Sequence, residues 1–108
     1  MRIRRTPALA LTMATLSITG LTAGPIVTVS QQNRAFTVAS LRISQGEAVR
    51  FSNDDRFLHQ IYVKAPSTAF ESEEQEPGKT VDIQFPKTGL FEVRCHIHPK
   101  MLLRVEVY

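Results

Sequence analysis

The stretch FEVRCHIHPKMLLRVEV, residues 91–107, contains two runs of alternating apolar and charged residues on either side of a short turn. Before the turn, Phe91, Val93 and Cys95 alternate with charged residues, and the same period returns over residues 103–107. Successive side chains of a β-strand point to opposite faces of the sheet. These residues therefore predict two half-buried strands, with the Cys95 side chain pointing into the core.

The same period of two recurs along most of the chain after Gly24. Short runs of this kind, separated by turn residues, predict an all-β domain, an antiparallel sandwich or barrel. The sequence predicts no helix and no second domain, and it predicts a loop at residues 65–79. The other expected strands cover residues 26–29, 41–43, 48–51, 57–63 and 81–85.

Residues 1–24 have a different composition. Three arginines precede an apolar run that carries no charge as far as Gly24. This order is typical of a secretory signal peptide, so we expect residues 1–24 to be a leader and residues 25–108 to be a periplasmic domain. Pro25 is unfavourable directly after a cleavage site. If the leader is retained, its apolar run of roughly 20 residues is long enough to anchor the domain in a bilayer.

The leader also carries the excess charge. The chain has 13 basic and 10 acidic residues, a formal net charge of +3, and Arg2, Arg4 and Arg5 account for that whole excess. The expected exported domain is therefore formally neutral. It has no basic stripe with interleaved aromatic residues, which excludes nucleic acid as an expected partner.

Cys95 is the only cysteine of the chain. One cysteine cannot form an internal disulfide, and an unpaired thiol in an oxidising compartment is a liability unless it is buried, reactive or bound to metal. A domain of about 84 residues has only a small core, so a bound metal would help to hold its fold.

Three further metal donors are placed to approach Cys95. His59 shares the inward phase of its own apolar run, while His98 and Met101 follow Cys95 at intervals of three residues. A tight turn can fold both back toward the Cys95 sulfur. Two imidazoles, a thiolate and a thioether suit copper that cycles between Cu(I) and Cu(II) in a trigonal site with a long axial methionine. Zinc also accepts these donors, so the preference for copper rests on their softness.

The run Cys95-His96-Ile97-His98-Pro99-Lys100-Met101, with a strand histidine upstream, resembles the cupredoxins, the type 1 blue-copper proteins. The loop spacing is similar to that of amicyanin-like and plastocyanin-like proteins. The segment LRISQGEAVRFSNDDRFLHQIYV, residues 41–63, resembles the part of the family that carries the first copper histidine. The resemblance covers residues 27–108.

The resemblance implies a small Greek-key β-sandwich or barrel that binds one type 1 copper ion. It implies His59, Cys95 and His98 as equatorial ligands, Met101 as the axial ligand, and electron transfer through the outer edge of His98. Many cupredoxins have an asparagine directly after the first histidine, which braces the ligand loop. Here that residue is Gln60, so we expect this contact to be placed differently.

We therefore expect a periplasmic, monomeric one-electron carrier that docks transiently with protein redox partners and is not an enzyme. Its mature domain does not insert into the membrane unless the leader stays attached. A copper chaperone or storage protein with the same ligands is the main alternative, to which His96 would contribute. A metal-free interaction module is a second, and an inward-facing Cys95 argues against a cysteine-nucleophile enzyme.

Three surface features can each be interpreted in two ways. The outward phase of His96 predicts an exposed side chain rather than a ligand. The glutamates of residues 71–76 form either a solvated loop or a docking patch for a basic partner. Ile97, Pro99 and Leu102 either form an apolar docking surface near His98 or only close the end of the sandwich.

Overall fold

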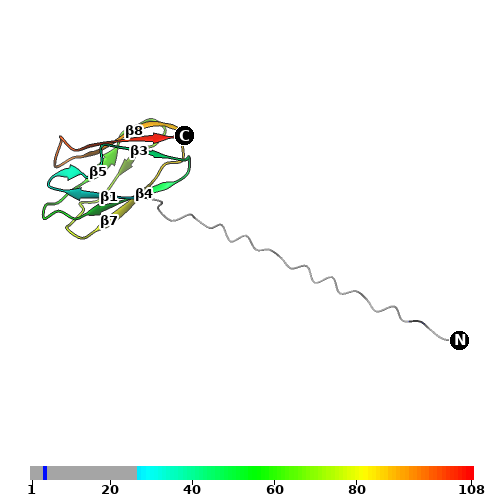
Figure 1. The fold of residues 1–108 in the computed structure, drawn as a ribbon, viewed down its shortest axis with the longest axis horizontal. Coiled ribbons are helices and arrows are strands. Elements are labelled where there is room, and N and C mark those ends of the chain that lie inside the picture. Colours follow the sequence, from blue (N-terminus) through cyan, green and yellow to red (C-terminus); the bar gives the residue numbers. More distant parts are fainter. Residues whose placement is uncertain (1–3, 5–26) are drawn as a thin grey trace.

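The computed structural model describes residue 4 and residues 27–108, so the expected leader lies outside the described residues except for Arg4. Figure 1 shows the described chain as two layers of strands. No helix capable of crossing a membrane occurs among these residues. The strands are β1 (Val27–Gln32), β2 (Ala35–Phe36), β3 (Ser40–Ile43), β4 (Ala48–Asn53), β5 (Ile61–Val63), β6 (Phe70–Glu71), β7 (Thr80–Gln84), β8 (Gly89–Cys95) and β9 (Leu102–Val107).

The two layers are a four-stranded sheet in the order β2-β1-β4-β7 and a five-stranded sheet in the order β3-β9-β8-β5-β6. The expected β-sandwich is confirmed, but it is mixed rather than purely antiparallel. The pairs β1–β4 and β3–β9 are parallel. Both join strands that are not neighbours in sequence, and the alternation of side chains is the same for either strand direction, so the sequence pattern could not reveal it.

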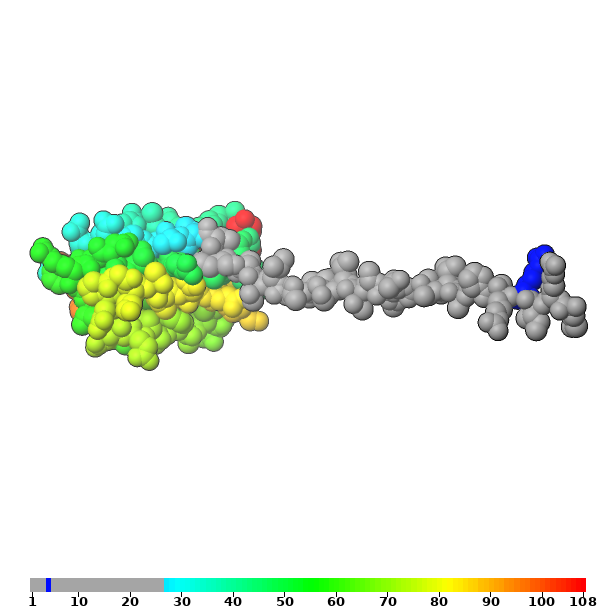
Figure 2. Space-filling model, turned by 90° about the horizontal axis from the view of Figure 1, so that it is seen from below, coloured from blue at the N-terminus to red at the C-terminus, as the bar shows by residue number. Residues whose placement is uncertain are grey.

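Alternation of side chains builds the core between the two sheets. In β8, Phe91, Val93 and Cys95 are buried while the charged residues between them face outward, as predicted. The rings of Phe85 and Phe91 lie 5.7 Å apart and help to fill the space between the sheets. In Figure 2 the yellow residues near position 80 lie beside the green residues near position 50, which agrees with the pairing of β7 with β4.

The strand expected over residues 57–63 is regular only over Ile61–Val63. His59 forms an isolated bridge with Gln75 instead. The Asn53 side chain explains the difference, since it accepts a hydrogen bond from the Asp55 N–H (2.9 Å) and donates one to the Phe57 carbonyl (2.8 Å). These bonds fold residues 53–57 into a loop, so β5 begins only at Ile61.

The acidic segment is less simple than a solvated loop. Its glutamates are exposed as expected, but Ser72 and Gln75 between them are buried. Phe70 and Glu71 also add a short edge strand to β5. The segment therefore packs against the sandwich beside His59 through its buried residues, while its glutamates face solvent.

Leu103 tests the contribution of the core. Its side chain is fully buried in β9, so Leu103→Ala should lower the free energy of unfolding by about 2–5 kcal/mol through lost burial and a cavity. Leu90→Ala is the matched control, because Leu90 is 82% exposed in β8, and it should change stability by less than about 0.5 kcal/mol. Urea unfolding of the metal-free protein, followed by circular dichroism, measures both. Equal costs would contradict the proposed core.

Candidate metal centre

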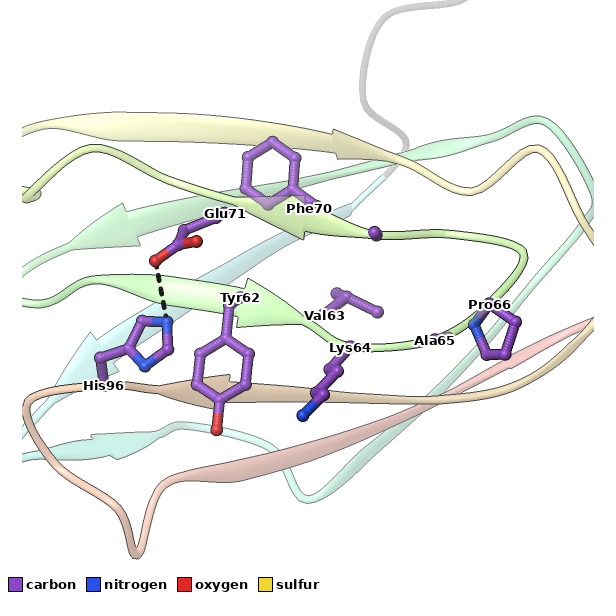
Figure 3. Close-up of a pocket in the computed structure, with 9 residues that line it drawn as sticks. Tyr62, Val63, Lys64, Ala65, Pro66, Phe70, Glu71 and His96 are labelled. Atoms are coloured by element: carbon purple, nitrogen blue, oxygen red, sulfur yellow. Dashed lines mark ion pairs between the residues drawn. The ribbon is translucent and has the colours of Figure 1, made fainter.

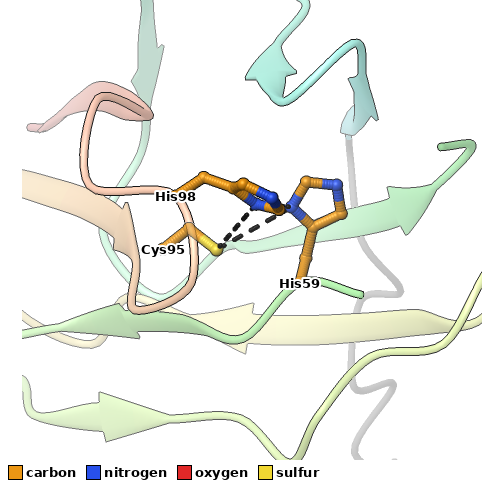
Figure 4. A group of neighbouring side chains, drawn as sticks. All are labelled: His59, Cys95 and His98. Carbon is orange, nitrogen blue, oxygen red and sulfur yellow. Dashed lines mark hydrogen bonds between the residues drawn. The ribbon is translucent and has the colours of Figure 1, made fainter. Parts of the chain in front are cut away.

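Three of the four predicted donors meet at one end of the sandwich. Cys95 ends β8, His59 lies on the bridge before β5, and His98 comes from the turn between β8 and β9. Figure 4 shows the three side chains pointing toward one another. The Cys95 Sγ lies 3.8 Å from the Nδ1 atom of each histidine, and the two Nδ1 atoms are 3.2 Å apart.

These spacings fit a trigonal metal site. A metal at about 2.0 Å from two nitrogens and about 2.3 Å from a sulfur holds them, at trigonal angles, about 3.5 Å and about 3.7 Å apart. The distances among His59, Cys95 and His98 match this triangle within a few tenths of an ångström. The ligand atoms therefore need little rearrangement to bind one ion.

Burial makes the three donors unequal. His59 is fully buried and Cys95 is 1% exposed, whereas His98 is only partly buried. These residues would hold a metal away from water, and His98 is the one donor of the three whose side chain is partly exposed. The lone thiol of the chain is thus kept inside, as the sequence predicted for an exported protein.

Met101 closes the ligand turn. Its backbone N–H donates to the His98 carbonyl at 3.0 Å, and its side chain is 2% exposed within the core cluster. The hydrogen bond closes a tight turn between His98 and β9, so His98 and Met101 both lie at the Cys95 end of the sheet. Its role as the axial ligand stays a prediction.

The Asp55 carboxylate fixes the orientation of His59. Because Nδ1 of His59 faces the other donors, its Nε2 donates to Asp55 Oδ2 at 3.1 Å. The side chain of Asp55 is only 5% exposed. Burial alone would raise the pKa of Asp55, but the Arg34 N–H, the His59 ring and the Arg56 N–H together hold that pKa below its ordinary value. A charged carboxylate behind a metal-binding histidine holds the ring and raises its basicity.

The hairpin between β1 and β2 supports the same carboxylate. Asn33 and Arg34 both have left-handed backbone, with φ of 54° and 56°, although neither is glycine. This turn brings the Arg34 N–H to within 2.8 Å of Asp55 Oδ2. Non-glycine residues in this conformation cost free energy and persist where neighbouring contacts compensate, as they do here.

An aromatic ring, Phe57, packs against His98, and the basic side chain of Arg34 lies on that ring. The Phe57 ring meets the His98 ring edge-on at 6.2 Å, and the Arg34 guanidinium lies 3.9 Å above the Phe57 ring. Burial lowers the pKa of His98, and its electrostatic interactions with His59 and Arg34 lower that pKa further against the opposing effect of Asp55. A lower pKa keeps the imidazole neutral, which is the form that binds a metal.

The Cys95 sulfur receives one backbone hydrogen bond, from the Gln60 N–H at 3.4 Å. The Gln60 side chain does not reach the ligand loop. Its amide donates to the Ser72 carbonyl at 3.1 Å, so it ties β5 to the acidic segment. The different placement expected from Gln60 is therefore observed, and the backbone supplies the link to the ligand loop through the His96 N–H, which donates to the Gln60 carbonyl at 2.9 Å.

A buried amide network behind the histidine was not predicted from the sequence. Gln75 and His59 exchange two backbone hydrogen bonds of 2.6 and 3.1 Å. The Gln75 side chain bridges to the Gln31 amide at 2.8 Å and to the Phe51 carbonyl at 2.9 Å. No pattern of apolar residues marks Gln31 or Gln75 as buried, and the contact of Asp55 with His59 depends on the loop of residues 53–57.

His96 lies outside the donor cluster. Its side chain is 42% exposed and contacts Glu71 rather than the other histidines. The outward orientation predicted from strand alternation is thus observed. Among the described residues, the group placed to hold a metal comprises His59, Cys95 and His98.

No protein-family model matches the sequence, and no curated protein matches it either. Solved structures do. An amicyanin variant is 21% identical and aligns with a TM-score of 0.71 over 82% of this chain and 87% of its own. A purple cupredoxin from Nitrosopumilus maritimus is 20% identical, with a TM-score of 0.67 over 76% of this chain and 99% of its own.

A third similar structure is larger. The copper-containing nitrite reductase of Thermus scotoductus SA-01 is 30% identical over 78% of this chain, with a TM-score of 0.69. The chain spans only 22% of that reductase. The protein thus has the cupredoxin fold, and the group of His59, Cys95 and His98 fits one type 1 copper site.

Replacing Asp55 tests whether its carboxylate supports the metal centre. Asp55→Asn keeps the shape but removes the charge behind His59, so the affinity for Cu(II) should fall by about 10–100-fold. Asp54→Asn is the matched control, because Asp54 accepts hydrogen bonds from Ser30 and Ser52 and does not contact His59. Competition with a chelator of known affinity measures both. Equal affinities for the two variants would show that Asp55 does not position the ligand.

Proposed function

We propose that this protein is a one-electron carrier whose copper ion is held by His59, Cys95 and His98, with Met101 as the axial ligand. One observation carries the proposal, namely that three donor atoms already stand at trigonal spacing, two of them buried and the third on a residue that reaches the surface. When bound, copper supplies the exchange between Cu(I) and Cu(II).

The protein holds the donors so that they move little when the charge of the site changes. Cys95 is fixed by the pairing of β8 with β5, and His59 by its bridge to Gln75 and its bond to Asp55. A site that keeps one geometry in both oxidation states has little reorganisation to undergo. Such rigidity favours rapid electron exchange over substrate chemistry.

The surface around His98 is suited to transient contact. Ile97 is 42% exposed, Pro99 is exposed, and Phe57 is half-buried against the His98 ring. The guanidinium carbons of Arg34 and Arg56 lie 3.9 and 5.5 Å from the centre of the Phe57 ring. An apolar centre with a basic edge fits a partner that presents carboxylates, and His98 would carry the electron across the contact.

The proposal includes export to the periplasm, a monomeric state and no enzymatic activity of the chain alone. The apolar, uncharged run after the N-terminal arginines supports export, and the burial of its lone thiol suits an oxidising compartment. Four protein donors would fill the coordination of the ion and leave no position for a substrate. The activity of the nitrite reductase belongs to a much longer chain.

A titration of the purified protein with Cu(II), followed by visible absorption and electron paramagnetic resonance, tests the proposed function. One equivalent should produce an intense thiolate-to-copper band that ascorbate bleaches and air restores. Cys95→Ser should abolish the band, while His96→Gln should retain it because His96 lies outside the cluster. Tight Cu(I) binding without such a band would indicate the copper chaperone alternative. Failure to bind copper at all would contradict both.

Met101 gives a second test, because two replacements should act in opposite directions. Met101→Leu removes the weak axial donor, which stabilises Cu(II) more than Cu(I), and should raise the reduction potential. Met101→Gln supplies a harder oxygen donor and should lower it. Voltammetry of the copper-loaded variants measures the potentials, with the thiolate band as evidence that Cys95 still binds. Equal potentials for both variants would remove Met101 from the ligand set.

A further inference from the structure

The carboxylate that holds His59 is itself held by the backbone of two arginines. The Arg34 N–H donates to Asp55 Oδ2 at 2.8 Å, and the Arg56 N–H donates to Oδ1 of the same carboxylate at 2.9 Å. Arg34 belongs to the hairpin between β1 and β2, whereas Arg56 directly follows Asp55 in the chain. Both bonds come from the main chain, so the Asp55 carboxylate is bound without the use of either guanidinium group.

Both arginine side chains instead reach the aromatic ring beside the other ligand histidine. The guanidinium carbon lies 3.9 Å from the centre of the Phe57 ring for Arg34 and 5.5 Å for Arg56. The Phe57 ring meets the His98 ring edge-on, with 6.2 Å between their centroids. Burial lowers the pKa of His98 most, and its electrostatic interaction with Arg34 adds to that effect. The metal centre is therefore within reach of positive charge on the side where His98 approaches the surface.

These two charges are left without a carboxylate partner, whereas several other cations of the domain are paired. Three arginines form ion pairs with carboxylates on the sheets, namely Arg42, Arg50 and Arg94. His96 lies 3.0 Å from Glu71 on the outer face of the five-stranded sheet, as Figure 3 shows. Among the described residues, neither Arg34 nor Arg56 makes an ion pair with a carboxylate side chain. Both are exposed, so an anion from outside can pair with them.

Positive charge beside a copper ion opposes its oxidation, because oxidation raises the charge of the ion by one. Arg34 and Arg56 should therefore raise the reduction potential of the bound copper. An anion that pairs with their guanidinium groups cancels part of this effect and stabilises the oxidised state. By linkage, the oxidised protein must then bind that anion more tightly than the reduced protein does, by the same factor.

We propose that Arg34 and Arg56 form a redox-linked binding site for carboxylates of the protein's electron acceptor. The proposal rests on the proposed function as an electron carrier and assigns a direction to electron transfer at this face. Pairing lowers the reduction potential of the carrier and raises that of the acidic partner, whose negative charge it offsets. One electron passes from the reduced carrier to the oxidised partner. The carrier ends one-electron oxidised and the partner one-electron reduced, with no proton moved and no covalent bond changed.

Voltammetry of the copper-loaded protein at low ionic strength tests the effect of the two charges. Arg34→Gln/Arg56→Gln removes both charges but keeps both N–H groups, so it should lower the reduction potential, with the ratio of Cu(II) to Cu(I) affinity rising about fivefold. Arg34→Lys/Arg56→Lys keeps the charges and should leave the potential near that of the wild type. The matched control Arg42→Gln/Arg50→Gln removes the same charge from two arginines that pair with carboxylates on the sheets, and it should shift the potential much less.

A hexaglutamate peptide serves as the probe for the carboxylates of the partner. It should lower the potential of the wild-type protein, and titration calorimetry should show tighter binding to the oxidised than to the reduced protein by the matching factor. Hexalysine should have neither effect. The Arg34→Gln/Arg56→Gln variant should lose both effects of hexaglutamate, whereas the Arg42→Gln/Arg50→Gln control should keep them.

Three results would overturn the redox-linked site. These are an unchanged wild-type potential with hexaglutamate, a peptide effect that persists in Arg34→Gln/Arg56→Gln, and equal potential shifts for the glutamine and lysine pairs. In each case, a normal thiolate band that ascorbate bleaches and air restores would leave the proposed electron carrier standing. Absence of that band in the wild-type protein would instead remove the proposed function itself.

Discussion

The pairing of β5 with β8 is the constraint on which the metal centre depends. Ile61 lies directly opposite Cys95, so the backbone N–H of Gln60 points at the Cys95 sulfur and His59 is brought to the same end of the sheet. A shift of register by one residue would turn every side chain of β5 to the other face. The apolar side chains of Ile61 and Val63 prevent such a shift because both are buried. Packing of the core and geometry of the site are thus set by one interaction.

The arrangement of the donors requires polar side chains to be buried at one end of the sandwich. His59, Asn53, Gln75 and Gln31 are all buried, and a buried polar group is costly unless it is hydrogen-bonded. The amides of Asn53, Gln75 and Gln31 bond to backbone carbonyls and to one another, and the Asp55 carboxylate accepts from His59. The bridge to Gln75 and the bond to Asp55 also fix the first histidine, so part of this polar network prepares the metal site. Metal binding would increase the free energy of unfolding of a small domain that has no disulfide.

Much of this could be predicted from the sequence. Alternation in residues 91–107 was enough to place Cys95 inside and His96 outside, and the spacing of His98 and Met101 indicated a ligand turn. Strand directions, the short strands β2 and β6, and the burial of Gln75 were not predictable, because they depend on pairing between distant segments and leave no periodic pattern. The support of Asp55 by Arg34 was hidden for the same reason, since its hydrogen bond joins two turns 21 residues apart.

X-ray absorption at the copper edge, recorded on the copper-loaded protein in both oxidation states, tests the central claim most directly. That claim is that the fold, rather than the ion, sets the positions of the donors. The account predicts one sulfur at about 2.3 Å and two nitrogens at about 2.0 Å, with shifts on reduction much smaller than the loss of a ligand. A first shell without a short sulfur, or the loss of a histidine nitrogen on reduction, would contradict it.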